Sequence, residues 1–115
     1  MEKLDDNAIA LIANYFQVLS EPMRLKVLNT LRSGDRNVGE LADLLGCTTA
    51  NISKHLSLLA KSGFVGRNTH GNSVYYRISD PAVFELCNTV CGQVGRRLVA
   101  QAEMAAQFVS LQDKE

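Results

Sequence analysis

The sequence predicts a mainly helical domain that carries one small β-hairpin. Apolar residues recur at helical spacing along most of the 115 residues, and only the segment 64–79 alternates with a period of two instead. Aromatic residues make up 6% of the chain and there is no Trp, so the core is expected to consist of aliphatic side chains. A chain of this length can bury one modest core, and we expect residues 1–115 to form a single domain.

The first third of the chain predicts two helices. Residues 7–19, NAIALIANYFQVL, place four apolar side chains at helical spacing: Ile9, Ile12, Phe16 and Leu19. In the following SEPMRLKVLNTLRSG, we expect Ser20 to be the N-cap, Pro22 to occupy the first turn and Gly34 to end the helix. Its buried stripe is expected to be Leu25, Leu28 and Leu31.

Two further helices joined by a tight turn are predicted over residues 38–62. The segment NVGELADLLGC ends at Gly46, and its inward residues are expected to be Leu41, Leu44 and Leu45. The segment TTANISKHLSLLAKSG begins at a cap of Thr48 or Thr49 and ends at Gly63, with Ile52, Leu56 and Leu59 inward. Two helices with a turn of this kind are typical of a helix-turn-helix.

A hairpin and a long final helix are predicted next. The segments FVGRNTH and SVYYRIS are joined by HGN, where Gly71 and Asn72 tolerate positive φ, so residues 64–79 form the hairpin. Asp80 as N-cap and Pro81 at the first position then open a helix over 80–110. Apolar or small residues surround much of this helix from Val83 to Phe108, more than one small domain can cover, which indicates a partner subunit.

The charge distribution points to a polyanion. The formal net charge is zero, but residues 48–79 contain four basic residues and no acidic one: Lys54, Lys61, Arg67 and Arg77. Residues 1–47 hold seven acids against five bases, and residues 80–115 hold five acids against three bases. A basic central third between acidic flanks favours a surface that faces nucleic acid. Chance clustering of four charges is the alternative.

The outer face of the helix that follows the turn carries short polar side chains. With the apolar stripe buried, this face holds Thr48, Thr49, Asn51, Ser53, Lys54, Ser57 and Lys61. Side chains of this size can approach base edges and phosphates, whereas the alternative is that they only cap and solvate the helix. The helix-turn-helix, the hairpin and the charge pattern together favour DNA binding.

These segments resemble the ArsR/SmtB family of winged-helix transcriptional repressors. The likeness runs from about Leu19 to Pro81 and includes S-x-H-L at residues 53–56, the following L-x-x-x-G-F-V and the strand Y-Y-R-I. The resemblance implies a winged helix-turn-helix in which the helix 48–62 enters the major groove of double-stranded DNA. It also implies that the hairpin acts as a wing, with Arg67, His70 and Asn72 as candidate contacts, and that helices 7–19 and 80–110 form a homodimer on a palindromic operator.

The single histidine of the S-x-H-L segment, His55, could suggest a metal site. Its place in that motif instead favours a contact in helix packing or with a phosphate, and we include it among the candidate DNA contacts on that basis.

Members of this family differ in where the inducer binds. The C-x-C pattern of one sensor type is missing from NVGELADLL, and the final helix has no His for the zinc site of another type. Cys87 and Cys91 in FELCNTVCG lie one helical turn apart, with Cβ atoms about 5–6 Å from each other. This spacing suits trivalent arsenic, antimony or a soft metal ion, persulfide or peroxide chemistry, or simple packing. Cys47, in the turn, is the weaker candidate.

Other function classes have less support. No apolar run approaches the ~18 residues of a membrane span, and the N-terminus lacks the build of a secretory signal. Three cysteines, an odd number, favour reduced thiols in the cytoplasm. No phosphate loop or nucleophile–base pair supports an enzyme. A regulator or interaction module that needs no ligand, with purely structural cysteines, stays open.

Overall fold

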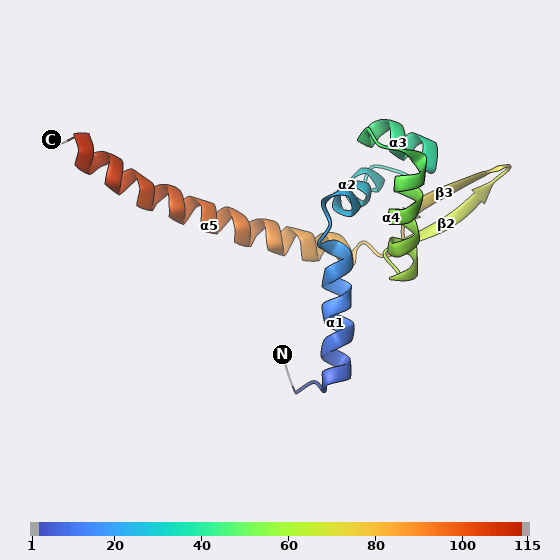
Figure 1. Cartoon of the computed structure of the whole chain (residues 1–115), viewed down its shortest axis with the longest axis horizontal. Coiled ribbons are helices and arrows are strands. Elements are labelled where there is room, and N and C mark those ends of the chain that lie inside the picture. Colours follow the sequence, from blue (N-terminus) through green and yellow to red (C-terminus); the bar gives the residue numbers. More distant parts are fainter. Residues whose placement is uncertain (1–2, 114–115) are drawn as a thin grey trace. The chain divides into compact units, whose positions relative to one another are not determined.

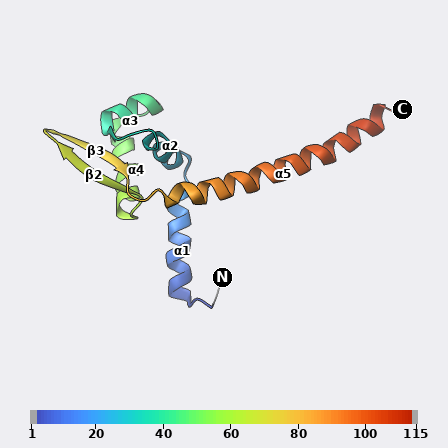
Figure 2. The same cartoon turned by 180° about the vertical axis from the view of Figure 1, so that it is seen from behind.

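The computed structural model describes residues 3–113, which divide after Asp80 into two units, Met1–Asp80 and Pro81–Glu115. The first unit contains α1 (Asp6–Leu19), α2 (Pro22–Leu31), α3 (Val38–Leu45), α4 (Thr49–Lys61) and three short strands. The second unit contains one helix, α5 (Ala82–Asp113). Figures 1 and 2 show the elements from two opposite sides, coloured in chain order.

The junction between α1 and α2 differs from the sequence prediction. Ser20 does not cap α2; its backbone N–H and its hydroxyl both donate to the carbonyl of Gln17, the hydroxyl at 2.7 Å, so it closes α1. Glu21 is the N-cap of α2 instead, because its backbone is extended and its carboxylate accepts from the Arg24 N–H at 3.0 Å. Carboxylates are favourable at this position because they satisfy free N–H groups at the positive end of the helix dipole.

The core of the first unit is mainly aliphatic, with Phe64 as its buried aromatic residue, but two of the expected stripes are rotated. In α2, Val27 is buried with Leu28 and Leu31, whereas Leu25 is 42% exposed. In α3, Leu41 and Ala42 are buried, whereas Leu44 is 60% exposed. The prediction for α4 is confirmed, since its three expected inward residues are fully buried: Ile52, Leu56 and Leu59.

The turn between α3 and α4 follows the predicted pattern. Gly46 has φ 67° and ψ 40°, a left-handed conformation that glycine adopts at little cost and that ends α3. Thr48 then caps α4, its hydroxyl accepting from the Asn51 N–H at 3.1 Å. The chain is thereby reversed within three residues, and α3 and α4 pack against each other.

The hairpin is confirmed and gains a third strand. Strands β2 (Val65–His70) and β3 (Ser73–Ile78) pair antiparallel around Gly71, whose φ is 62°, whereas Asn72 has no positive φ, as in a type II′ turn. The two-residue strand β1 (Arg36–Asn37) pairs with the other side of β3, giving the order β1-β3-β2. The unit is a winged helix-turn-helix, with the β2–β3 hairpin as its wing.

The second unit is a single helix of 32 residues, about 48 Å long at 1.5 Å per residue. It begins one residue after Pro81 and continues to Asp113, past the expected end at 110. Val83 is its one buried residue in the part of the chain that is described. Large apolar side chains are more than half exposed along much of its length, among them Val90, Leu98, Val99, Met104, Phe108 and Leu111.

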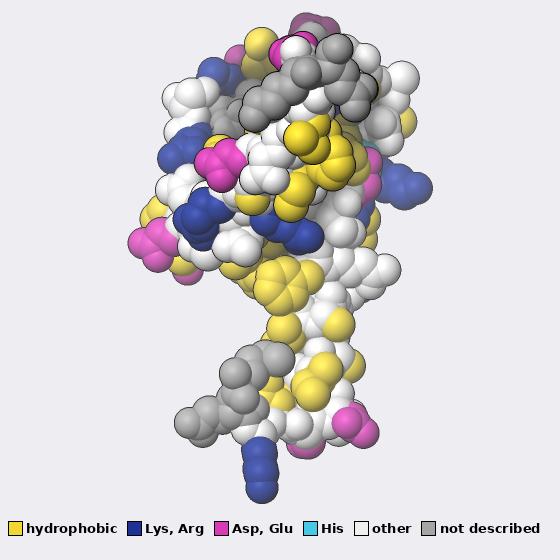
Figure 3. Space-filling view, turned by 90° about the vertical axis from the view of Figure 1, so that its left-hand side faces the viewer, with side chains coloured by type: hydrophobic (Ala, Val, Ile, Leu, Met, Phe, Trp, Pro, Cys, Tyr) yellow, Lys and Arg dark blue, Asp and Glu magenta, His cyan; other side chains and the backbone are white. Residues whose placement is uncertain are grey.

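Helix α1 also leaves apolar side chains uncovered. Ile9 is 46% exposed, Leu11 73% and Phe16 51%, and Figure 3 shows hydrophobic side chains on the surface of α1 in the lower part of the picture. The described residues, 3–113, contain no helix with the length and apolar content needed to cross a membrane.

Candidate nucleic-acid interface

The outer face of α4 is accessible as expected. All seven polar residues expected there are exposed: Thr48, Thr49, Asn51, Ser53, Lys54, Ser57 and Lys61. The rigid base of this face is the fully buried stripe described above, and the helix N-terminus is fixed by the Thr48 cap. No acidic side chain lies within 48–79, so an approaching phosphate meets only basic and neutral groups of this segment.

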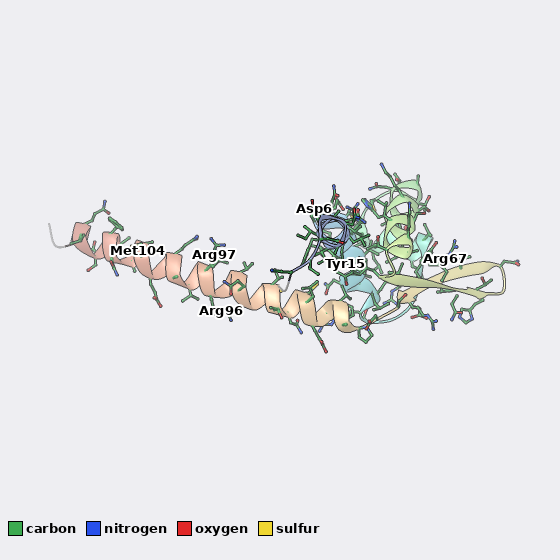
Figure 4. All side chains as sticks on the ribbon, turned by 90° about the horizontal axis from the view of Figure 1, so that it is seen from below. Asp6, Tyr15, Arg67, Arg96, Arg97 and Met104 are labelled. Atoms are coloured by element: carbon green, nitrogen blue, oxygen red, sulfur yellow. The ribbon has the colours of Figure 1, made fainter. Side chains whose placement is uncertain are left out.

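A groove separates α4 from the wing. It has a volume of about 330 Å³ and is lined by Ser57, Ala60 and Lys61 of α4 with Arg67 and Tyr76 of the wing. Arg67 and Tyr76 are register partners in the β2–β3 ladder, and Figure 4 shows Arg67 at the wing. One cation from the helix and one from the wing thus line the same groove, where they can bind a phosphate of a DNA backbone.

Tyr76 was missing from the candidate residues. Both tyrosines of SVYYRIS are half-buried, and the sequence alone does not say which one lies opposite Arg67. In the structure Tyr76 is the tyrosine that pairs with Arg67. In the sequence, only the basic residue at position 67 pointed to this part of the wing.

The two candidates at the wing tip are exposed. His70 ends β2, and its ring lies edge-on to that of Tyr75, with centroids 5.5 Å apart. Asn72 is the second residue of the turn. Both are placed where they can reach a DNA groove or a backbone phosphate.

His55 is not on the candidate surface. It is 9% exposed on the buried side of α4, with its Nδ1 atom 3.4 Å from Arg24 Nη1 and 3.8 Å from Glu21 Oε2. The burial of its ring supports the helix-packing role and disfavours a phosphate contact, so we remove His55 from the candidate DNA contacts.

The cysteines differ in accessibility. Cys47 and Cys87 are half-buried, and Cys91 is exposed. Cys87 and Cys91 both lie on α5, one turn apart, as predicted. Among residues 3–113, no group of three or more His, Cys, Asp or Glu side chains could hold a metal ion within one chain. A two-thiolate site on α5 would therefore need a further donor from elsewhere.

A second groove lies between α1 and α4. It has a volume of about 350 Å³, and its walls include Leu11, Tyr15 and Val18 of α1 and Leu58 of α4. The Tyr15 ring also packs on Phe64, with centroids 4.6 Å apart, and Figure 4 shows Tyr15 on α1. Helix α1 thus combines exposed apolar side chains with a groove along the side that faces α4.

The sequence matches the model of one family of bacterial regulators, and it is similar to individual transcriptional regulators. The model of the family described as bacterial regulatory protein, arsR family, matches residues 21–66. An uncharacterized helix-turn-helix transcriptional regulator of Mycobacterium tuberculosis, Rv0081, is 36% identical over 75 residues, which cover 64% of this chain and 66% of that protein. The probable mercury resistance operon repressor of Streptomyces lividans is 34% identical over 74 residues, covering 64% and 59%. The chain thus spans slightly less than two thirds of these relatives.

Solved structures share the fold. The crystal structure of M. tuberculosis Rv0081 has a TM-score of 0.79 and 30% identity, covering 85% of this chain and 99% of that one. A homodimeric winged helix-turn-helix DNA-binding domain from Mycobacterium bovis has a TM-score of 0.72 and 27% identity, covering 85% and 94%.

Proposed function

The chain belongs to the ArsR family of bacterial regulatory proteins, and from this we propose that it is a homodimeric transcriptional repressor that binds a palindromic DNA operator. The proposal includes release of the operator when a thiophilic ion occupies Cys87 and Cys91 or a reagent modifies them. We call α4 the recognition helix from here on.

The observation that carries DNA binding is the groove between the recognition helix and the wing. Lys61 and Arg67 line it from two different elements, and the exposed polar face of α4 continues from its wall. Phosphate contacts from Lys and Arg provide affinity that does not depend on sequence. Asn51, Ser53 and Ser57, which are short and exposed, are the side chains proposed to contact base edges in the major groove.

The exposed apolar surfaces of α1 and α5 support the dimer. A helix with uncovered Leu98, Val99 and Phe108 is normally covered by a partner, and α1 adds Leu11 and Phe16. The M. bovis relative is described as a homodimer. Two-fold symmetry would place two recognition helices in successive major grooves, as a palindromic site requires.

The thiols of α5 are the proposed inducer site. Their spacing of one turn lets two thiolates bind one soft ion, and a donor from the second subunit would complete a three-coordinate site. The relative from S. lividans is a probable repressor of a mercury resistance operon, which supports a thiophilic inducer such as Hg(II), arsenite or antimonite. Binding must favour the dimer geometry with low DNA affinity, through a coupling of about 1–3 kcal/mol.

Operator release tests the inducer site. Wild-type protein on a DNA duplex that it has selected from a random library is exposed separately to arsenite, antimonite, Hg(II), Cd(II), Zn(II), a persulfide donor and peroxide. We expect one of the thiophilic reagents to release the DNA, and we expect Cys87→Ser and Cys91→Ser to abolish that release. Cys47→Ser is the matched control and should respond like wild type. A normal response in both α5 variants would refute the proposed site.

Thiol modification is the second candidate for induction, because Cys91 is exposed and accessible to a reagent. A Cys87–Cys91 disulfide within an intact helix is disfavoured, since Cβ atoms about 5–6 Å apart exceed the usual ~3.8 Å. An oxidised product would therefore be expected to link two subunits or to distort α5. If none of the reagents releases DNA, the protein is a ligand-independent regulator whose cysteines only pack.

A further inference from the structure

We propose that Arg24 is a positioning residue that ties the C-terminal turn of α1 to the buried side of the recognition helix through His55. The proposal rests on the proposed function, because it takes α4 as the helix that contacts base edges. It assigns to Arg24 and His55 a share in operator selectivity, although neither side chain belongs to the DNA-facing surface.

The guanidinium of Arg24 is fixed to α1 by two backbone carbonyls. Its Nε donates to the carbonyl of Val18 at 2.6 Å, and its Nη2 donates to the carbonyl of Gln17 at 3.4 Å. The Val18 carbonyl lies in the last turn of α1, where carbonyls have no partner within the helix and a cation is favourable. The Gln17 carbonyl accepts from Ser20 as well. Arg24 belongs to α2, so this contact links α2 to the end of α1.

The third nitrogen of the same guanidinium faces the recognition helix. Nη1 lies 3.4 Å from Nδ1 of His55. In this hydrogen bond the guanidinium is the donor, because arginine has no acceptor atom, and Nδ1 of His55 is the acceptor. His55 is 9% exposed and lies on the buried side of α4 that also carries the fully buried Leu56. Its ring therefore lies at the packed side of the helix.

Glu21 fixes the other end of Arg24. Its Oε2 accepts from the backbone N–H of Arg24 at 3.0 Å and lies 3.8 Å from His55 Nδ1. The side chain and the backbone of Arg24 are thus both held, and three donors of one planar group meet acceptors on two helices. A lysine, with one ammonium on a flexible stem, cannot span the same acceptors.

The consequence concerns how α4 is aimed. Base contacts depend on the placement of the recognition helix to a fraction of a hydrogen-bond length, whereas phosphate contacts by long side chains tolerate small shifts. The buried stripe holds α4 against the core, and the link from Val18 to His55 adds a further constraint on its rotation. Removing that link permits a small rotation of α4 about its axis. The affinity for the selected duplex should therefore fall, whereas the affinity for a random-sequence duplex should stay the same.

The test compares Arg24→Gln with Lys26→Gln, which makes the same charge change at an exposed position of the same helix. Both are titrated, as folded dimers confirmed by circular dichroism and sedimentation, against the duplex selected by wild type and against a random-sequence duplex. We expect Arg24→Gln to lose about tenfold in affinity for the selected duplex, within the usual range for indirect coupling, with random-duplex affinity and salt slope unchanged. Lys26→Gln should match wild type for both. Unchanged selectivity in Arg24→Gln, or an equal loss on both duplexes, would overturn the proposal.

A second pair of variants separates the link from general stability. His55→Asn keeps an acceptor close to the position of Nδ1, whereas His55→Leu fills the space without one. We expect His55→Asn to retain most of the selectivity and His55→Leu to lose it. Adding Arg24→Gln to His55→Leu should cause no further loss of selectivity, because both changes remove the same link. Independent, additive losses would contradict a shared link. If wild type selects no duplex at all, the proposed function fails; if it selects one and these variants select it equally well, only this inference fails.

Discussion

Asn37 and Glu40 cap one another at the start of α3. The Asn37 side chain accepts from the Glu40 N–H at 2.8 Å, and the Glu40 carboxylate accepts from the Asn37 N–H at 3.0 Å. Asn37 also pairs with Tyr75 in the sheet. Asn37 therefore joins the start of α3 to the sheet, because it is both the last residue of β1 and the N-cap of α3.

Asn37→Ala should destabilise the folded state by about 1 kcal/mol, because it leaves N–H groups at the start of α3 without an acceptor. Chemical denaturation measures the change. Glu40→Gln is the control, since glutamine can accept the same hydrogen bond, and it should stay close to wild type. An equal loss in both variants would mean that charge, and not the reciprocal cap, stabilises this end of α3.

Removing either cation of the groove should weaken DNA binding at every sequence. Lys61→Gln and Arg67→Gln are each expected to reduce the salt slope by about 1, the amount for one lost phosphate contact. Fluorescence anisotropy titrations over a range of salt concentrations provide the slope.

The control for the groove is Lys26→Gln on α2, a loss of the same charge outside it. Its slope should equal that of wild type. Slopes that do not respond to Lys61 or Arg67 would place the phosphate path elsewhere on the molecule.

Two leucines of the helix-turn-helix should differ sharply in their contribution to stability. Leu56→Ala should cost about 2–5 kcal/mol, because the side chain is fully buried and its removal leaves a cavity. Leu44→Ala should cost roughly 0.5 kcal/mol or less, because Leu44 is 60% exposed. Denaturant midpoints of the two variants decide this, and similar losses would indicate that Leu44 is covered, for example by a partner.

A charge in the apolar surface of α5 should separate the subunits. Val94 is 50% exposed, and Val94→Glu would bury a carboxylate in the proposed dimer contact. Sedimentation equilibrium should show at least a tenfold weaker dimer, which corresponds to about 1.4 kcal/mol.

Gln107→Glu places the same charge at an exposed position on the opposite side of the helix, thirteen residues after Val94, and serves as the control for Val94. It should leave the dimer intact. A Val94→Glu protein that associates as tightly as wild type would show that α5 is not the dimer contact.

The sequence predicted the helices and the hairpin well because each has strong end signals. Gly46 and Thr48 define the turn, and Gly71 defines the hairpin. The period of an apolar pattern does not fix helix rotation when neighbouring residues are also apolar. For this reason α2 buries Val27, where the pattern had predicted Leu25.

Features that depend on residues distant in the chain could not be predicted. Strand β1 is two residues long and exists only because β3 lies beside it. The place of Tyr76 in the groove follows from strand register, and the contact of His55 with Arg24 joins two helices that are distant in the chain. The exposed face of α4 was predictable in full, because it is the complement of a regular buried stripe.

The most direct measurement of the central claim is a footprint of the wild-type protein on its selected duplex, combined with the binding stoichiometry. The account predicts two chains per duplex and two protected major-groove segments about 34–36 Å apart, related by two-fold symmetry. It also predicts that Asn51→Ala weakens protection within both segments. One chain per duplex, or a single protected segment that does not respond to changes in α4, would contradict it.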